Sequence, residues 1–393
     1  MHSIRRSCQS AVRGSNYVCA YGNGSRRAFS RSCARSRGAL PVFLEPSSPE
    51  LSSLLSIFNS KILLPSHLTK EQQKLVYEQE NKAKLDAEPV EITLGDVTVP
   101  LEHIDRNRLP NTWKHFREIL AKSETREDFE NVVRLLEGFE NAGIRVRPQW
   151  RELVVRKLNL NGMQHLVLKA LQRPKATGLR LRDYNVLVQV LRGVHDKAAL
   201  SDWTEEDTAK ALRLAKQVVE LMDDEEHCGE QARGTMASQN DWRGKPAVIA
   251  LPTELAAVLA ERHGGDVAEV KKFVGRLVNA LIQGEFTTEL DAISQRSNQA
   301  PTAFANKASQ QDFVTAHCHE LLQLVFVWNA LKTSHKVLGI DMPLADEASK
   351  VESKIELVLL EGAKAADKLR TRDGKEMGNQ YVEYVKNAIE RCQ

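Results

Sequence analysis

Cysteine is scarce in this sequence and follows no regular spacing. Six cysteines occur among 393 residues, and no two of them form a CxxC pair. The spacing therefore excludes the closely paired thiols of common zinc modules and the framework of a disulfide-stapled domain. From it we predict no metal site and no bound cofactor.

The sequence also lacks the motifs of the common enzyme classes. It contains no Gly-x4-Gly-Lys-Ser/Thr phosphate loop, and no dinucleotide-binding glycine pattern follows a strand. The consecutive His317, Cys318 and His319 would diverge by about 100° each on a helix, so they cannot converge on one metal. We therefore expect no catalytic residue and no small-molecule substrate. An enzyme with an unrecognised site in residues 247–393 is the alternative.

Long apolar runs are absent as well. The longest strongly apolar stretch runs from Leu321 to Trp328, and Gln323 interrupts it. Because a helix needs about 20 apolar residues to cross a bilayer, we predict no membrane span.

Acidic residues are missing from the N-terminus, where none precedes Glu45. The first 38 residues hold eight serines and no lysine. They also hold eight arginines, namely Arg5, Arg6, Arg13, Arg26, Arg27, Arg31, Arg35 and Arg37. A segment rich in arginine and serine and free of acids is typical of a mitochondrial presequence, because the membrane potential draws positive charge inward.

The end of this segment resembles a processing site. Arg27-Ala28-Phe29-Ser30 is similar to the arginine-x-aromatic-serine pattern that matrix processing enzymes cut. This predicts a presequence over residues 1–29, with cleavage between Phe29 and Ser30, and a protein located in the mitochondrial matrix. The alternative is a disordered basic tail that binds nucleic acid or acidic lipid.

Removing the leader reverses the sign of the net charge. The whole chain carries 55 basic and 52 acidic residues. Residues 39–393, which lack all eight of these arginines, hold 47 basic residues against the same 52 acids, which gives a net charge of −5. Such a chain has no global basic field, so any contact with nucleic acid must come from a local patch.

Helical patterns dominate the remainder of the chain. Apolar residues recur at helical spacing in successive segments joined by short connections, which predicts an all-α fold of helical hairpins. One exception is a small β-hairpin at 90–99, where alternating apolar residues flank Gly95-Asp96. The predicted organisation is an N-terminal arm (30–106) with short helices and this hairpin, a helical-repeat region (107–225), an inserted polar loop (226–246) and a C-terminal helical region (247–393).

Capping signals and turn residues predict several helix ends. Ser48-Pro49-Glu50 predicts the start of a short helix. Thr69 to Gln72 has the spacing of a capping box, and we expect a polar helix from there to about Leu85. Further along, we expect a helix over residues 251–263 and a loop over roughly 294–309.

A short motif recurs within the helical-repeat region. Gly143-Ile144-Arg145-Val146-Arg147 returns 35 residues later as Gly178-Leu179-Arg180-Leu181-Arg182, and each copy lies between two predicted helices. A fixed period of 20 to 50 residues indicates a solenoid built of helix pairs. The glycines suit helix ends, where a left-handed residue often terminates the helix.

A helix-turn-helix unit of 35 residues resembles the pentatricopeptide repeat family. Gly178-Leu179 and the helix start Tyr184-Asn185-Val186-Leu187 are similar to the family's loop and first helix, and the helix pair from Pro252 to Leu281 looks alike. The resemblance implies an α-solenoid that works in mitochondrial gene expression. An ordinary all-α domain of helical hairpins is the alternative.

Basic residues are concentrated in one stretch of this region. The stretch from Arg145 to Arg182 contains ten basic residues and a single acid, Glu152. They are Arg145, Arg147, Arg151, Arg156, Lys157, Lys169, Arg173, Lys175, Arg180 and Arg182. Because guanidinium forks match phosphate groups, we predict that these residues contact RNA along one edge of the solenoid. The alternatives are a solvated face, or a surface that pairs with the acidic segments 202–207 and 223–226.

Base-specific reading of RNA is not predicted. The pentatricopeptide family reads bases with small polar residues near the start of the first helix, where this chain has Val186 or, in the first copy, Arg151 and Glu152. This departure favours contact with the RNA backbone, with RNA shape or with protein. We expect most of the five tryptophans to be packing anchors, whereas Trp242 in the polar loop is a candidate protein-interface residue.

Together these features predict a non-enzymatic matrix scaffold for organelle gene expression. We expect a subunit of the mitochondrial ribosome, or a translation factor bound to it, with rRNA or mRNA and ribosomal proteins as partners. The alternative is an assembly factor or accessory subunit of a respiratory-chain complex, which would bind protein and no RNA.

Overall fold

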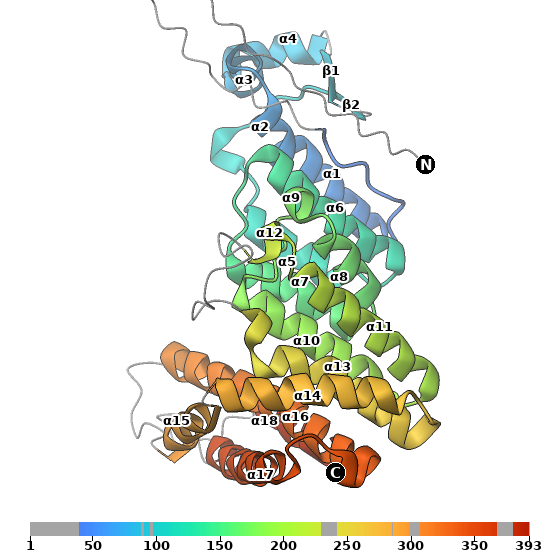
Figure 1. The fold of residues 1–393 in the computed structure, drawn as a ribbon. Coiled ribbons are helices and arrows are strands. Elements are labelled where there is room, and N and C mark those ends of the chain that lie inside the picture. The colour runs from blue at the N-terminus through green and yellow to red at the C-terminus, as the bar shows by residue number, and fades with distance from the viewer. Residues whose placement is uncertain are drawn as a thin grey trace, which may run out of the picture. The chain divides into compact units, whose positions relative to one another are not determined.

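In the computed structural model, helices follow one another from the arm to the C-terminal region (Figure 1), which confirms the predicted all-α fold. The structure describes residues 39–87, 90–94, 97–228, 242–284, 286–298, 307–367 and 380–392. The described residues belong to one compact unit. The predicted presequence, residues 1–29, and its cleavage position at Phe29 and Ser30 lie outside them.

The N-terminal arm contains a capped helix at the predicted position. α1 (Pro49–Ile57) starts after Ser48, whose hydroxyl accepts a hydrogen bond from the Leu51 amide at 3.2 Å. α1 runs through a π-helical turn (Phe58–Leu63) into α2 (Leu64–His67). The side-chain cap satisfies an amide that the first turn leaves without an intrahelical partner.

The second helix predicted for the arm is interrupted. α3 (Lys70–Tyr77) has the expected capping box at Thr69. The prediction of a continuous helix to Leu85 is wrong, because Glu78 has an extended backbone and α4 (Lys82–Ala87) begins after a 3-10 turn. Within α3, whose residues are all described, a single side chain is buried. Apolar packing therefore does little to extend this helix.

The predicted β-hairpin is confirmed. β1 (Glu91–Leu94) pairs antiparallel with β2 (Val97–Pro100), in the register that places Leu94 opposite Val97. Leu94 is buried, whereas the remaining residues of the two strands are half-buried or exposed. The Gly95-Asp96 turn lies outside the described residues.

The extended segment that precedes α1 lies along α6 (Arg126–Ala142) and is held by side chains of that helix. The Asn131 amide group accepts from Leu44 N at 2.7 Å and donates to Leu44 O at 3.0 Å. Ser47 donates to the Asp128 carboxylate through its amide at 3.0 Å and through its hydroxyl at 2.6 Å. Burial alone would raise the pKa of Asp128. The hydrogen bonds from Ser47 and from the Thr125 and Glu124 amides together outweigh burial and lower the pKa below its usual value.

The chain is helical through most of its remaining length. Besides α6, the elements are α5 (Thr112–Lys122), α7 (Pro148–Leu160), α8 (Gln164–Leu171), α9 (Pro174–Thr177), α10 (Tyr184–Ala199), α11 (Glu205–Leu221), α12 (Glu225–Cys228), α13 (Pro246–His263), α14 (Val267–Gln283), α15 (Phe286–Asn298), α16 (Lys307–Leu338), α17 (Ala345–Asp367) and α18 (Gln380–Cys392), with 3-10 turns at Arg106–Arg108, Trp242–Gly244 and Gly339–Asp341.

Successive helix pairs pack in series. α7 contacts α10, α10 contacts α13, and α13 packs along α16 (Figure 1). In the second row, α8 contacts α11, and Lys216 of α11 pairs with Glu269 of α14 at 2.7 Å. The first helices of neighbouring pairs thus contact one another, and so do the second helices, as expected for a helical-repeat fold. Kinship with the pentatricopeptide family stays a prediction.

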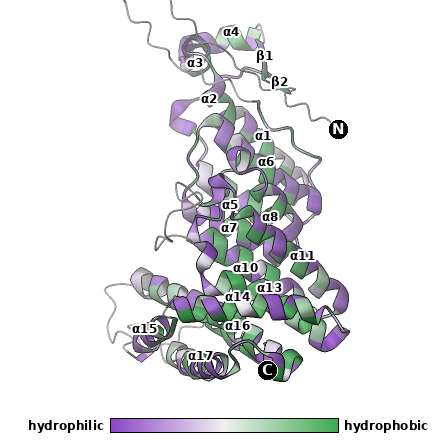
Figure 2. Cartoon of the chain, viewed as in Figure 1, coloured by the Kyte–Doolittle hydropathy of each residue, from purple (hydrophilic) through white to green (hydrophobic). Residues whose placement is uncertain are grey.

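α13 is packed against helices on several sides. It contacts α10, α11, α14 and α16, and Figure 2 shows hydrophobic residues over much of its length. The helix begins at Pro246 rather than at residue 251, so the predicted start is wrong. It also continues through Pro252, which lacks the amide for one intrahelical bond. Burial against four helices stabilises α13 enough to tolerate this loss.

The predicted start of the loop at residue 294 is wrong, because α15 continues to Asn298. Residues Phe286–Asn298 are helical although the segment is rich in polar side chains. Phe286, Leu290 and Ile293 are buried, and the helix packs against α17. The apolar residues recur at helical spacing, but the pattern is short enough to be hidden by the surrounding serines and threonines.

The inserted polar loop is helical at both of its described ends. α12 occupies its first residues, and the 3-10 turn Trp242–Gly244 lies close to its end. Residues 229–241 of the predicted loop lie outside the described residues.

Candidate nucleic-acid interface

The two copies of the glycine motif form neighbouring loops. Gly143 and Gly178 both have left-handed backbones, with φ of 68° and 70°, as predicted for helix ends. Close to the loops, Arg151 Nη1 at the start of α7 pairs with Asp183 Oδ2 at 2.6 Å, just before α10. A Cβ added to Gly178 would lie 2.1 Å from the Glu140 carboxylate in the last turn of α6. The 35-residue period of the sequence therefore brings its two loops together.

Three arginines of these loops are available to a partner. Arg145 and Arg147 follow Gly143, Arg182 follows Gly178, and all three are exposed. None of them makes an ion pair with a described residue. Within the described part of the chain, their guanidinium groups are therefore free to bind phosphate bidentately.

Other cations of the basic stretch are neutralised within the chain. Arg173 pairs with Glu137 at 2.7 Å, and both Lys175 and Arg180 lie 3.5 Å from the Glu226 carboxylate. Lys175 and Arg180 thus pair with the acidic segment 223–226, as the alternative expected. Arg173 pairs outside the two named segments, and so does Arg151, with Asp183. Their charge is compensated before any RNA approaches.

The other cations of the stretch differ in their surroundings. Lys169 is exposed and Lys157 is half-buried. Arg156 is half-buried as well, and its charge acts on the titration of Glu152 and His319. We therefore regard Lys157 and Lys169 as the two remaining candidates for phosphate contact.

The positions at which pentatricopeptide proteins read bases are engaged inside this chain. Val186 is fully buried. Glu152 accepts a hydrogen bond from Gln189 Nε2 at 3.2 Å, and burial raises its pKa. Arg151 is held by its ion pair. None of these three described side chains is placed to meet a base.

Trp242, near the end of the inserted loop, contacts the residues at the start of α10. Its indole Nε1 donates to the Arg182 carbonyl at 3.1 Å, and its ring lies 5.1 Å from the ring of Tyr184. Both aromatic residues line a cavity of about 330 Å³, together with Lys245, Glu289 and Gln323. Trp242 is half-buried, so part of its surface remains open to a partner.

The other tryptophans are packing anchors, as predicted. Trp113 stacks on Trp150 with ring centres 5.2 Å apart and an angle of 13° between the planes. Trp150, Trp203 and Trp328 are buried. Large aromatic side chains contribute most of the area that such helix contacts remove from water.

The histidine of the inserted loop is also structural. His227 is buried, accepts from the Leu181 amide at 3.1 Å, and lies 2.8 Å from the Leu171 carbonyl through its second nitrogen. Burial lowers the pKa of His227, which favours the neutral ring that this pair of contacts requires.

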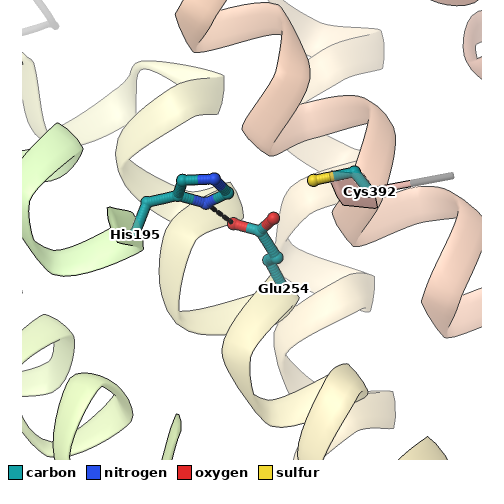
Figure 3. A group of neighbouring side chains, drawn as sticks. All are labelled: His195, Glu254 and Cys392. Atoms are coloured by element: carbon teal, nitrogen blue, oxygen red, sulfur yellow. Dashed lines mark hydrogen bonds and ion pairs between the residues drawn. The ribbon is translucent and has the colours of Figure 1, made fainter. Parts of the chain in front are cut away.

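One cluster of ionisable side chains has no counterpart in the sequence analysis. His195, Glu254 and Cys392 come from three different helices and are all buried (Figure 3). Their ligand atoms lie within 4.8 Å of one another. The prediction of no metal site rested on spacing along the chain, and spacing cannot reveal residues that meet only in the folded protein.

The described helices are all too short or too polar to cross a bilayer.

Comparison with known proteins identifies relatives over most of the chain. Residues 27–386 match the family described as mitochondrial ribosomal protein mS27. The chain is 25% identical over 338 residues to a Neurospora crassa protein named small ribosomal subunit protein mS27. This similarity covers 80% of the chain and 83% of the Neurospora protein. The match spans the arm, the paired helices and most of the C-terminal region.

Proposed function

The chain belongs to the mitochondrial ribosomal protein mS27 family, and from this premise we propose that it is a non-catalytic component of the small subunit of the mitochondrial ribosome in the matrix. The observation that carries the proposal is the extent of the family match, which includes nearly every described helix. The name of the Neurospora relative supports the assignment to the small subunit.

The N-terminal composition supports the location in the matrix. Eight arginines and no acid occur in the first 38 residues, as in presequences that the membrane potential draws inward. The family match begins at residue 27, next to the cleavage position proposed between Phe29 and Ser30. The proposed mature protein therefore consists of the arm (30–106), the helical-repeat region (107–225), the inserted loop (226–246) and the C-terminal region (247–393).

Within this function, we propose that the paired loops contact the backbone of rRNA. Arg145, Arg147 and Arg182 are exposed, lie on neighbouring loops and make no ion pair with a described residue. The mature chain is acidic overall, so its field does not attract RNA in general and contact is confined to this edge. Because backbone contacts carry no sequence information, the loops position the protein on rRNA rather than read bases.

Neighbouring ribosomal proteins are the second class of partner that we propose. The acidic remainder of the surface and the half-buried Trp242 suit protein contact more than phosphate. The alternative role in assembly of a respiratory complex receives no support from the family match.

The proposed RNA contact predicts a change in salt dependence. Replacing Arg145, Arg147 and Arg182 together with glutamine should weaken binding to mitochondrial small-subunit rRNA. The slope of log K against log salt should flatten by about 2 to 3, since each lost phosphate contact removes about 0.7–0.9. Filter binding over a series of salt concentrations measures both quantities.

A matched variant distinguishes loss of the loop arginines from a general loss of positive charge. Arg262→Gln, Lys272→Gln and Arg276→Gln remove the same charge from exposed positions on α13 and α14. This variant should keep the wild-type slope within the error of the measurement. An equal loss in both variants, or no loss in the first, would remove the paired loops from the proposed interface.

A further inference from the structure

The buried cluster joins three helices that are far apart in the sequence. His195 belongs to α10, Glu254 to α13 and Cys392 to α18. The exposed fractions of these residues are 0%, 0% and 7%. Figure 3 shows the imidazole, the carboxylate and the sulfur directed toward one another. Nitrogen, oxygen and thiolate sulfur are the donor atoms that zinc takes from proteins.

The separations of the donor atoms suit a tetrahedral ion. His195 Nδ1 and Glu254 Oε2 are 3.1 Å apart. Two zinc bonds of about 2.0–2.1 Å at a tetrahedral angle place their donor atoms about 3.3 Å apart, and a thiolate lies about 3.6 Å from the others. All three donor groups lie within 4.8 Å of one another. Closing the site therefore requires shifts of about 1 Å among the three donor atoms.

A second layer of hydrogen bonds orients the carboxylate. Glu254 Oε1 accepts from Asn329 Nδ2 at 2.6 Å, and Asn329 Oδ1 accepts from the Thr333 hydroxyl at 3.2 Å. Asn329 thus holds one carboxylate oxygen, and the other oxygen contacts His195 Nδ1. Outer partners of this kind hold ligands in place at metal sites.

The cluster also contains a polar atom without a partner. His195 Nε2 is buried and has no hydrogen-bond partner among the described residues. A buried polar atom that stays unsatisfied costs about 1–3 kcal/mol. Zinc sites with three protein ligands bind a water as the fourth; a second water at Nε2, on the far side of the ring from Nδ1, would satisfy the remaining nitrogen.

We propose that His195, Glu254 and Cys392 bind a zinc ion that fastens the C-terminal helix α18 to α10 and α13. The backbone of the same helix end is held nearby, because Lys332 Nζ donates to the Cys392 carbonyl at 3.0 Å and Trp203 Nε1 donates to the Arg391 carbonyl at 3.3 Å. We assign the ion a structural role because all three ligands are buried. The inference does not depend on the proposed contact with rRNA.

Zinc content of the mature full-length chain tests the proposal. Protein purified without chelator should contain one equivalent of zinc by elemental analysis, and Cys392→Ser or Glu254→Gln should lose it. Either substitution should weaken zinc affinity by more than the roughly 10- to 100-fold expected for an outer partner alone. Cys318→Ser is the matched control, because Cys318 is also buried on a helix but lies outside the cluster.

Cobalt binding provides a second measurement, and its first step uses the wild-type chain alone. Co²⁺ added to the demetallated wild-type chain should give the absorption of a cobalt–thiolate bond. The band should persist in Cys318→Ser and be lost in Cys392→Ser, with helix content checked by circular dichroism. If the wild-type chain holds no zinc and takes up neither Zn²⁺ nor Co²⁺, or if Cys392→Ser keeps full zinc content, the proposal is overturned.

Discussion

Replacing Trp203 with alanine is expected to lower the free energy of unfolding by roughly 3–5 kcal/mol. Trp203 is 2% exposed and lies in the turn between α10 and α11. Its ring packs edge-on against His195 at 5.5 Å between ring centres. Its carbonyl lies 2.8 Å from His263 Nε2 of α13. Removing the indole leaves a large cavity where α10, α13 and the end of α18 meet.

Urea unfolding and hydrogen exchange measure this loss. The exchange of amides in α10 and α18 should accelerate most, because those helices lose packing against the indole. Trp242→Ala is the matched control, since Trp242 is half-buried, its indole donates to the Arg182 carbonyl at 3.1 Å, and its ring contacts Tyr184. Equal losses in the two variants would show that Trp203 does not anchor α18.

Acidification is expected to destabilise the protein through His319. Burial, together with the charges of Arg192 and Arg156, lowers the pKa of His319 from 6.5 to about 4. The unfolded chain binds a proton near pH 6.5, whereas the folded chain resists protonation until about pH 4. The contribution of His319 to stability is therefore complete above about pH 6.5, falls as the pH is lowered and levels off below about pH 4. The full loss is on the order of 3 kcal/mol, at about 1.4 kcal/mol for each pH unit.

His319→Gln removes the titrating group and tests how much of the pH dependence of stability comes from His319. Free energies of unfolding at intervals between pH 7.5 and 4 should fall less steeply for the variant than for the wild type. The comparison uses the change with pH, so a constant loss caused by the substitution itself does not enter. Identical pH dependence in the two proteins would contradict the assignment to His319.

Local signals in the sequence predicted the helix ends that depend on a few neighbouring residues. Ser48 and Thr69 cap α1 and α3 as expected. Gly143 and Gly178 take the left-handed backbone that their positions after helices suggested. Such features are predictable because the hydrogen bonds and dihedral angles involved lie within about one helical turn.

Features that depend on tertiary packing were predicted less well. Pro252 lies inside α13 because four neighbouring helices bury that helix, and nothing in the local sequence reveals them. α15 was missed because its short apolar stripe gains its stability from contact with α17. In both cases the packing of distant helices outweighed the local propensity.

The candidate sites also divide into features set by the local sequence and features set by tertiary packing. The exposed Arg145, Arg147 and Arg182 followed from a repeat that is visible in the sequence. The acids that neutralise other cations, such as Glu137 and Glu226, come from other helices, so the available set could not be predicted. His195, Glu254 and Cys392 meet in the folded chain and share no spacing that a motif could recognise.

The most direct test of the proposed function is the sedimentation of the tagged mature protein from mitochondrial extracts. We predict that it migrates with the small ribosomal subunit and shifts to lighter fractions after treatment with RNase. Migration with a respiratory-chain subcomplex, unchanged by RNase, would contradict the account.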